Sequence, residues 1–340
     1  MTTNALKNNI VLTSRVRLAR NYFDLPFSNA RRPENSQLCV SRAREAFECT
    51  EDLSSYTIHQ LSKIPEDEKM SLVEQHLISH DLLQNNPYGA VLVRDDQTIS
   101  IMVNEEDHLR IQAMQKGLML EKAADMAFEA ESKLQSVCAF SFDNQLGYLT
   151  ACPTNTGTGM RASLMLHLPM LTRCKQMGTV SQSVAKLGLT IRGIYGEGSD
   201  AQGDLYQVSN QVTLGRTEKE IIEAVNAVGN QLIDMENALR KRAVADAIFD
   251  LEDRIFRSYG ILRYARKITT EEFMEHWSSL RLGASLELIP LTFESIDTLL
   301  TTGQNAHAVL YANKQNRPLS VDQARAEIIR AALNPTIQEG

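Results

Sequence analysis

The sequence lacks paired cysteines, a long apolar run and an excess of basic charge, and each absence excludes a class of protein. Its five cysteines are scattered without a CxxC pair, which predicts reduced thiols rather than a disulfide framework or a zinc site. No apolar run is long enough to cross a bilayer, and the opening MTTNALKNNI lacks the apolar core of a secretion signal. The net charge of −7 argues against a surface for duplex nucleic acid. We expect a cytoplasmic protein without membrane or direct nucleic-acid partners.

Strand-like patterns fill the first two thirds of the chain and then almost vanish. The 340 residues, with 43% hydrophobic and 23% charged residues, are ordinary for a soluble globular protein of one or two domains. From Glu218 onward the apolar residues recur with a helical period. The pattern predicts an α+β fold, with an antiparallel β-sheet flanked by helices over residues 11–239. An α-helical C-terminal domain is expected over residues 240–340.

Three acids stand in a row in NEEDHLR, residues 104–110. Apolar residues alternate at 99, 101 and 103 before this stretch and at 109, 111 and 113 after it, which predicts a strand, a turn and a second strand. An isolated acidic turn is most often a solvated surface. Carboxylates on a rigid strand end also suit proton transfer, so both interpretations stay open for this stretch alone.

Five arginines occupy strand or loop positions beside glycine-rich or acidic segments. They are Arg15, Arg17, Arg110, Arg161 and Arg192. Arg15 and Arg17 lie two residues apart, so on a strand they share a face. The planar guanidinium group suits phosphate, often through two parallel hydrogen bonds. Each arginine alone is more often a surface charge, but five of them in an acidic protein indicate a phosphate site.

Two glycine-rich stretches, residues 152–161 and 192–203, allow a backbone to approach a ligand closely. Neither is a Walker loop, because no GK[ST] sequence follows. The spacing Gly196-x-Gly198-x-x-Ala201 fits a loose dinucleotide pattern, yet the following DLYQVSNQVTL reads as a strand where that fold needs a helix. We therefore treat this match as accidental.

Two carboxylates and one cysteine are candidates for chemistry. Glu197 lies among glycines as Glu106 lies at the predicted hairpin, and a pair of carboxylates could grip one guanidinium group by bidentate hydrogen bonds. Cys152 precedes Pro153 and a Gly/Thr loop. A small buried residue is the favoured interpretation of a random cysteine, whereas nearby arginines could lower the pKa of its thiol toward a thiolate that orients a guanidinium.

Four stretches, in order along the chain, resemble the phosphagen (guanidino) kinase superfamily and, within it, the bacterial protein arginine kinases. They are TSRVRLARN, NEEDHLRIQ, CPTNTGTGMRASLMLHLP and IRGIYGEGSDAQGDLYQVSNQVTLG. The family fold is an antiparallel sheet flanked by helices, so the resemblance implies that residues 11–239 are a catalytic domain. It also implies transfer of the ATP γ-phosphoryl group to arginine side chains of proteins. The cosubstrate would be ATP with Mg²⁺, the metal being held by the nucleotide phosphates without protein ligands.

The resemblance also implies roles for individual residues. Glu106 and Glu197 match the two catalytic carboxylates, Glu105 is a further contributor, and Cys152 matches the reactive cysteine beside the guanidinium. The implied nucleotide site consists of Thr13, Ser14, Arg15, Val16, Arg17, His76, Arg110, Arg161, Ala162, Ser163, Leu164, Met165, Arg192, Gly193, Ile194, Tyr195, Gly196 and Glu197.

The helical tail favours the protein-kinase branch of the superfamily. Metabolite guanidino kinases carry a helical domain ahead of the catalytic one, whereas here TSRVR begins at residue 13 and a helical tail follows. In the protein-kinase branch this tail supports a homodimer and holds a phosphoarginine pocket with an RDxxRA motif. The stretch VDQARA matches at Asp322, Arg325 and Ala326, but Val321 replaces an arginine, which would weaken such a pocket. Family context further implies an activator protein and a protease or chaperone complex that receives proteins marked during stress.

Two alternatives stay open beside the protein kinase. One is phosphorylation of free arginine or another small guanidine, which the missing N-terminal helical domain disfavours. The other is an adaptor that binds phosphoarginine without turnover, against which the presence of Glu106, Glu197 and Cys152 argues.

Overall fold

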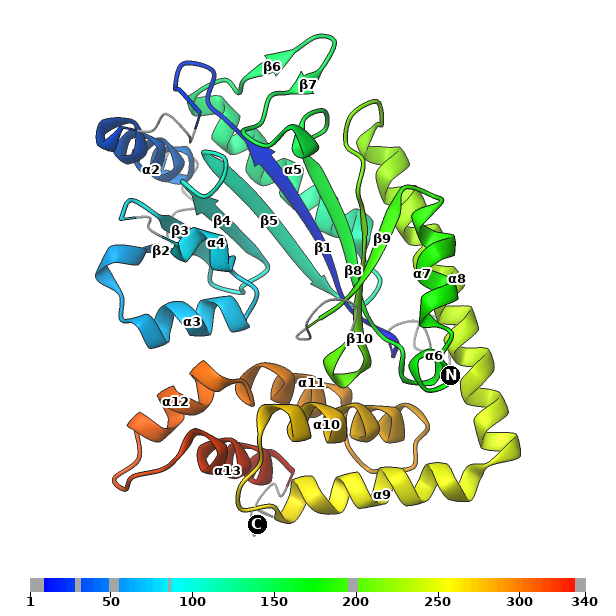
Figure 1. Cartoon of the computed structure of the whole chain (residues 1–340). Coiled ribbons are helices and arrows are strands. Elements are labelled where there is room, and N and C mark those ends of the chain that lie inside the picture. Colours follow the sequence, from blue (N-terminus) through cyan, green and yellow to red (C-terminus); the bar gives the residue numbers. More distant parts are fainter. Residues whose placement is uncertain (1–8, 28–31, 49–54, 85–86, 195–200, 334–340) are drawn as a thin grey trace.

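An eight-stranded sheet forms the centre of this computed structural model, which describes residues 9–27, 32–48, 55–84, 87–194 and 201–333. In their order across the sheet, the strands are β2 (Tyr56–Gln60), β3 (Ala90–Arg94), β4 (Ile99–Val103), β5 (Leu109–Lys116), β1 (Val11–Arg20), β8 (Met160–His167), β10 (Leu205–Asn210) and β9 (Leu189–Gly193). Every neighbouring pair is antiparallel, as Figure 1 illustrates. A small hairpin of β6 (Phe142–Asp143) and β7 (Gly147–Tyr148) stands apart. The predicted antiparallel sheet is confirmed.

Helices flank the sheet and then form a separate layer below it in Figure 1. Around the sheet lie α2 (Pro33–Glu48), α3 (Glu66–Glu74), α4 (His80–Leu83), α5 (Leu120–Val137), α6 (Pro169–Arg173), α7 (Met177–Ala185) and α8 (Glu218–Asp246), with short 3-10 turns η3 (Leu61–Lys63), η4 (Pro153–Asn155) and η5 (Gln202–Asp204). The lower layer consists of α9 (Ile248–Tyr264), α10 (Thr270–Ser285), α11 (Phe293–Thr302), α12 (Asn305–Asn313) and α13 (Val321–Leu333). None of the helices in the described ranges has both the length and the apolar character needed to cross a membrane.

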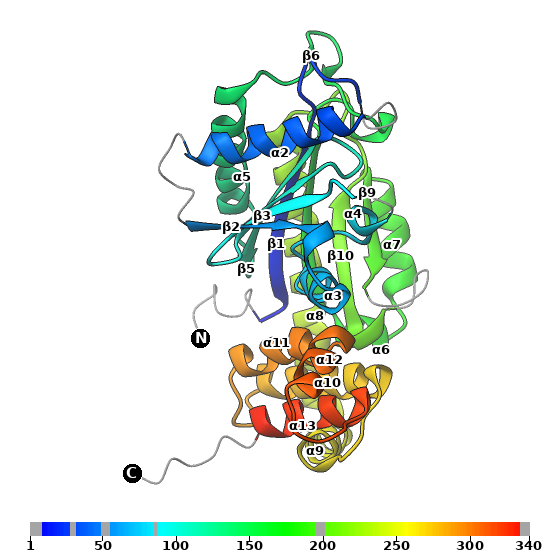
Figure 2. The same ribbon diagram turned by 90° about the vertical axis from the view of Figure 1, so that its left-hand side faces the viewer.

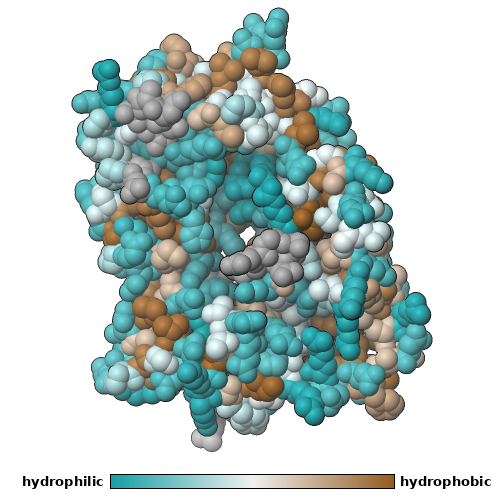
Figure 3. Space-filling view, in the orientation of Figure 1, coloured by the Kyte–Doolittle hydropathy of each residue, from teal (hydrophilic) through white to brown (hydrophobic). Residues whose placement is uncertain are grey.

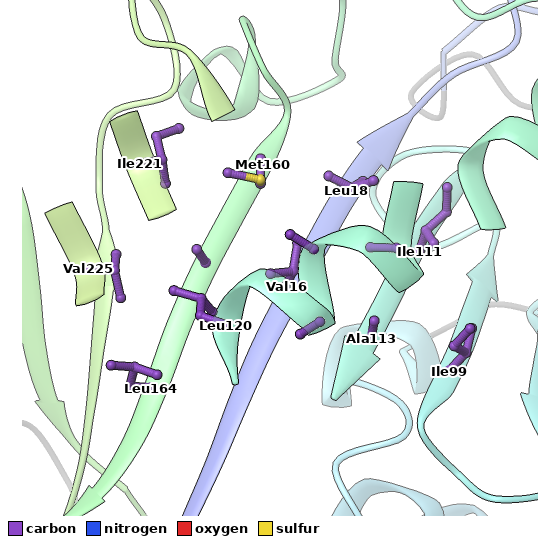
Figure 4. Packing of buried hydrophobic residues seen from close by; sticks show 14 of the residues in the cluster. Val16, Leu18, Ile99, Ile111, Ala113, Leu120, Met160, Leu164, Ile221 and Val225 are labelled. Carbon is purple, nitrogen blue, oxygen red and sulfur yellow. The ribbon is translucent and has the colours of Figure 1, made fainter. Parts of the chain in front are cut away.

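The main core lies between one face of the sheet and helices α5 and α8. Val16 and Leu18 of β1 are fully buried, and they alternate with side chains that point to the opposite face. Leu120 begins α5, and buried residues recur along that helix at spacings of three and four. Ile221 of α8 packs in the same cluster (Figure 4). The alternation of β1 therefore commits one face of the sheet to the core and leaves the other face for polar side chains.

The lower helices have a second apolar core around Trp277, whose indole N–H donates to the Ile296 carbonyl at 2.8 Å. Helix α8 joins the two cores as one continuous helix. Its first half packs on the sheet, while Leu239 and Ala243 near its end pack against the second cluster. The domain boundary expected between residues 239 and 240 falls inside this helix and stays a prediction.

Candidate active site

The arginines that the sequence singles out lie on the face of the sheet opposite the main core. Arg17 of β1 lies opposite Arg161 of β8 on one side and Gln112 of β5 on the other. Arg15 is two residues from Arg17, and Arg110 is two residues from Gln112, so these side chains share one face of the pleated sheet. Figure 3 shows a hollow lined by hydrophilic residues over this part of the molecule.

This arginine face extends to the edge strand β9. Gln207 of β10 lies opposite Met165 of β8 and opposite Arg192 of β9. Met165 is an even number of residues from Arg161, so Arg192 belongs to the same face. Arg15 Nη2 donates to Gln207 Oε1 at 2.6 Å, and this bond fixes its guanidinium group along the floor of the hollow.

The five like charges raise the energy of the site when it contains no anion. Burial, followed by the charges of Arg15, Arg110 and Arg161, holds the pKa of the Arg17 guanidinium well below its ordinary value. Burial, followed by Arg192 and Arg110, also lowers the pKa of Arg161. Within the described residues, the buried Nε of Arg17 has no hydrogen-bond partner. A ligand with several negative charges would relieve this repulsion and would accept that hydrogen bond.

His76 lies beside the arginine face, two residues after the end of α3 at Glu74. Its backbone φ of +59° is in the left-handed region, and its carbonyl accepts a hydrogen bond from Gln112 Nε2 at 2.7 Å. Burial, followed by the charges of Arg15 and Arg17, lowers the pKa of His76 to about 4. The imidazole is therefore neutral near pH 7, so it adds no further positive charge beside Arg15 and Arg17.

Strand alternation divides the other residues expected at the nucleotide site into two groups. Thr13, Ser163 and Met165 share the arginine face. The side chains of Ser14, Val16, Ala162 and Leu164 are buried on the opposite face. The Ser14 hydroxyl donates to the Gly117 carbonyl at 2.7 Å. The second group supports the strands from the core side, so any part it has in nucleotide binding passes through its backbone.

The remaining residues expected at the nucleotide site lie on β9 or directly after it. Gly193 ends β9, and Ile194 follows it with its amide donating to the Leu205 carbonyl at 2.9 Å. Tyr195, Gly196 and Glu197 lie outside the described residues. The second expected catalytic carboxylate, that of Glu197, therefore stays a prediction.

The three successive acids of the NEEDHLR stretch have three different environments. Glu105 is buried, and its carboxylate accepts hydrogen bonds from Arg110 Nη1 at 2.5 Å and from the Ser79 hydroxyl. Asp107 is also buried, and its Oδ1 accepts a hydrogen bond from the Ala151 amide at 2.7 Å. Glu105 thus orients an arginine of the polar face, while Asp107 fastens the hairpin to the segment that leads to Cys152.

Glu106 is the acid of this run that faces the site. Its side chain is 42% exposed, with Oε2 lying 3.6 Å from Arg110 Nη2 and accepting a hydrogen bond from Asn155 Nδ2 at 3.3 Å. Asn155 ends η4, the short turn that follows Cys152. The half-buried Cys152 places its Sγ 3.0 Å from the Thr154 hydroxyl. Glu106 and the cysteine loop are therefore neighbours, although they are far apart in the sequence.

Two residues to which the sequence pattern assigns no role contribute to this geometry. Asp107 belongs to the acidic run and Asn155 to the CPTN stretch, but neither spacing indicates a contact with the opposite loop. Their roles are visible only from the hydrogen bonds in the structure, where Asp107 accepts from the Ala151 amide and Asn155 donates to Glu106. In both hydrogen bonds the cysteine loop donates and a carboxylate of the hairpin accepts, so the two loops are joined at two points.

The residues expected to form a phosphoarginine pocket lie in the lower helices, distant in the fold from the arginine face. Arg325 is 0% exposed, and its guanidinium donates to the carbonyls of Gly303 at 2.7 Å and Ile268 at 2.8 Å. It also donates to the Asp322 carboxylate at 2.7 Å, while Ala326 is buried beside it. Arg325 therefore joins α13 to neighbouring segments of the helical layer, and the pocket stays a prediction.

Two family models match different parts of the chain. Residues 39–239 match the family model described as ATP:guanido phosphotransferase, C-terminal catalytic domain. Residues 249–339 match the model described as Protein-arginine kinase McsB C-terminal domain. A curated protein-arginine kinase of Caldanaerobacter subterraneus subsp. tengcongensis is 42% identical over 96% of this chain and 97% of its own. Another, from Moorella thermoacetica, is 42% identical over 95% of this chain and 94% of its own.

Solved structures of guanidino kinases share the fold. A lombricine kinase superposes with a TM-score of 0.60 at 25% identity, covering 72% of this chain and 70% of that one. The duplicated taurocyamine kinase of Schistosoma mansoni, solved with transition-state analogue components, gives a TM-score of 0.64 at 23% identity and covers 80% of this chain and 42% of that one. The chain therefore belongs to the ATP:guanido phosphotransferase family, in its branch of protein-arginine kinases.

Proposed function

We propose that this protein transfers the γ-phosphoryl group of ATP to arginine side chains of proteins. The observation that carries the proposal is a juxtaposition: the five-arginine face ends at the hairpin that presents Glu106 beside the Cys152 loop. A surface for a polyanion thus adjoins a carboxylate suited to a guanidinium group. The match to proteins named protein-arginine kinase supports the choice of acceptor.

The arginine face fits the triphosphate of the nucleotide. The charges that now repel one another around Arg17 would be neutralised by phosphate oxygens, and its buried Nε would donate to one of them. Phosphoryl transfer depends mainly on holding the reactants in line and on neutralising the charge on the transferred group. The arginine residues would provide both: four of them lie on β1, β5 and β8 in the middle of the sheet, and Arg192 lies on the edge strand β9.

The acceptor needs a base because a protonated guanidinium group is not a nucleophile. Its pKa exceeds about 12, so it must lose a proton as the new bond forms. The attacking nitrogen uses its lone pair to bond to the γ-phosphorus, the bond to the bridging oxygen breaks, and ADP leaves with that electron pair. In this proposal Glu106 accepts the proton, Glu197 is the second carboxylate, and Cys152 orients the guanidinium. A placed base contributes roughly 10²–10⁴-fold to the rate.

Mg²⁺ would accompany ATP, held by the phosphates. Among the described residues no group of three His, Cys, Asp or Glu side chains is arranged to hold a metal ion. The ion's contribution when bound is to neutralise negative charge on the phosphates. The residues of the arginine face contribute the rest of the neutralisation, and they orient the phosphates through hydrogen bonds in fixed directions.

The wider setting is proposed from the resemblance. Residues 11–239 would be the catalytic domain, and residues 240–340 a helical domain that supports a homodimer; the two family matches, ending at 239 and beginning at 249, support this division. The protein would act in the cytoplasm, under an activator protein, and would mark other proteins for a protease or chaperone complex during stress.

The test is turnover of ATP and Mg²⁺ with an unfolded arginine-rich protein and, in parallel, with free arginine. Products are identified by mass spectrometry without acid, because the N–P bond is labile to acid. We expect phosphoarginine in the protein and none from free arginine. Product from free arginine alone would assign a metabolite kinase instead, and the absence of both products, with candidate activators present, would favour an adaptor.

A further inference from the structure

Helices α3 and α12 meet where the sheet domain contacts the lower helices. Both views show α12 lying against α3 (Figures 1 and 2). Glu74, the last residue of α3, accepts hydrogen bonds from the amides of Ala306 at 2.7 Å and His307 at 3.1 Å. The same carboxylate also bonds to His307 Nδ1 at 2.7 Å. One side chain of the sheet domain thus holds three groups of the opposite domain.

Glu74 supplies the N-terminal cap of α12 from another part of the chain. Gln304 occupies the N-cap position of α12, but its own side chain makes no capping hydrogen bond there. The first amides of a helix need acceptors, and a negative charge near them is favourable. At the end of α3, by contrast, the same negative charge opposes the helix dipole. The position of Glu74 is therefore unfavourable for α3 alone and favourable only with α12 in place.

The residues that follow Glu74 lead directly to the arginine face. Gln75 Nε2 lies 3.3 Å from His307 Nε2, so His307 contacts both residues. His76 comes next, with a left-handed backbone and a carbonyl held by Gln112 of β5. The segment 74–76 is thus fixed at one end by α12 and at the other by the strand beside Arg17. The contact between α12 and Glu74 thus lies only two residues from His76.

We infer that Glu74 and His307 are positioning residues for the nucleotide site: their clasp across the two domains sets the place of His76 over the arginine face. This inference rests on the proposed function. Their hydrogen bonds join the end of α3 to the start of α12, so both act on the arginine face through His76. The consequence is that the helical domain contributes to ATP affinity without contacting the nucleotide.

The experiment compares Glu74→Gln and His307→Ala with Asn313→Ala. Asn313 belongs to α12 and contacts Asp67 of α3 at 3.4 Å, so it crosses the same interface without leading to His76. We expect Glu74→Gln to raise the KM for ATP about three- to thirty-fold, the range that follows from losing a charged cap. The kcat and the KM for the protein substrate should stay within about twofold. His307→Ala keeps the two amide bonds and should give a smaller rise, and Asn313→Ala should give none.

A double-mutant cycle separates positioning from general loosening. If Glu74 acts through His76, then Glu74→Gln should raise the KM for ATP little further in a protein that already carries His76→Ala. Additive effects would overturn the inference, as would equal effects of Glu74→Gln and Asn313→Ala. Titration with ADP by calorimetry gives the same comparison as dissociation constants. It keeps the inference testable even if the wild-type protein phosphorylates no arginine, a result that would count against the proposed function only. Far-ultraviolet circular dichroism checks that each variant is folded. If Glu74→Gln does not fold, the KM for ATP of His307→Ala alone tests the inference, and an unchanged KM would overturn it.

Discussion

At the scale of single residues, the three successive acids Glu105, Glu106 and Asp107 have different roles although they are of the same chemical type. Glu105 and Asp107 are buried and accept hydrogen bonds from Arg110, Ser79 and Ala151, whereas Glu106 is exposed beside Asn155. The first two acids maintain the architecture of the hairpin. The chemistry proposed for the run therefore depends on its middle residue.

Replacing Glu106 by glutamine should remove the proposed base and keep the shape of the side chain. We expect kcat to fall roughly 10²–10⁴-fold, with the Kd for ADP changed less than about threefold. Rapid-mixing or steady-state assays measure the rate, and calorimetry measures binding. Asp107→Asn is the matched comparison, since it should act by lowering stability. A Glu106→Gln protein with wild-type kcat would exclude Glu106 as the base.

Replacing Arg17 by methionine should separate stability from binding. Burial and the like charges of its neighbours lower the pKa of the Arg17 guanidinium, so its charged form is destabilised when the site holds no anion. We expect Arg17→Met to melt at the same or a higher temperature than the wild type without nucleotide. Added ADP should then raise the melting temperature of the wild type and hardly that of the variant. A variant stabilised by ADP as much as the wild type would contradict the phosphate site.

The pKa of His76 gives stability a definite dependence on pH. The pKa is lowered from 6.5 to about 4 in the folded protein, so the unfolded chain binds this proton more readily. The contribution of His76 to stability is present above pH 6.5 and is lost as pH falls toward 4. The loss should be on the order of 2–3 kcal/mol. Urea unfolding of the wild type and of His76→Gln at pH 7 and pH 4.5 measures it, and equal losses in both proteins would refute it.

At the scale of elements, close approach between helix α8 and strand β8 sets the thickness of the core. Gly229 lies within α8, and a Cβ placed on it would lie 2.4 Å from Cδ1 of the buried Leu164. Glycine is a weak helix former, so its presence in mid-helix needs a packing reason, and this contact supplies one. The helix can lie against the strand because this position has no side chain.

Valine at position 229 should therefore lower the free energy of unfolding by about 1–3 kcal/mol through overpacking. Gly260 in α9 offers the control, because nothing lies within 4 Å of a Cβ built there. Gly260→Val should change stability by less than about 0.5 kcal/mol. Chemical denaturation of both variants measures the difference, and equal effects at the two sites would show that the Leu164 contact does not matter.

The elements differ in how far the sequence predicts them. Alternation in residues 11–20 is local, so it predicts both the strand and the shared face of Arg15 and Arg17. The same alternation places the Val16 side chain on the face opposite the arginines. The family pattern, which assigns Val16 to the nucleotide site, does not by itself make this distinction. The bond between Glu74 and His307 joins residues 233 positions apart, and no local pattern predicts a helix cap supplied from that distance. Contacts of this kind depend on the tertiary packing of the helices and strands.

At the scale of the whole molecule, buried polar groups hold the two parts of the chain together. Arg281 of α10 is buried, and it donates to Asp297 at 2.7 Å and to the Asn9 carbonyl at 2.6 Å. The buried His167 of β8 lies 2.8 Å from the Ser278 hydroxyl, which in turn bonds to Asp204. The helical layer therefore contacts the sheet domain through satisfied polar groups as well as through apolar packing.

Removing the charge of Arg281 should weaken this junction. Arg281→Met should lower the free energy of unfolding by about 2–4 kcal/mol, because Asp297 and the Asn9 carbonyl lose their partner. Scanning calorimetry measures the loss and shows whether the wild type melts in one transition. Arg254→Met, which removes a more exposed arginine, is the control and should cost less than about 1 kcal/mol. Similar losses in the two variants would show that the junction does not depend on Arg281.

The clasp at Glu74 has a consequence for regulation. A contact that favours ATP binding by placing His76 must, by thermodynamic reciprocity, itself be strengthened when ATP binds, and by the same factor. The binding of any molecule that alters the start of α12 is thereby coupled to the binding of the nucleotide, although the two ligands do not contact each other. The carboxylate of one glutamate would then serve as the point at which two distant equilibria are linked.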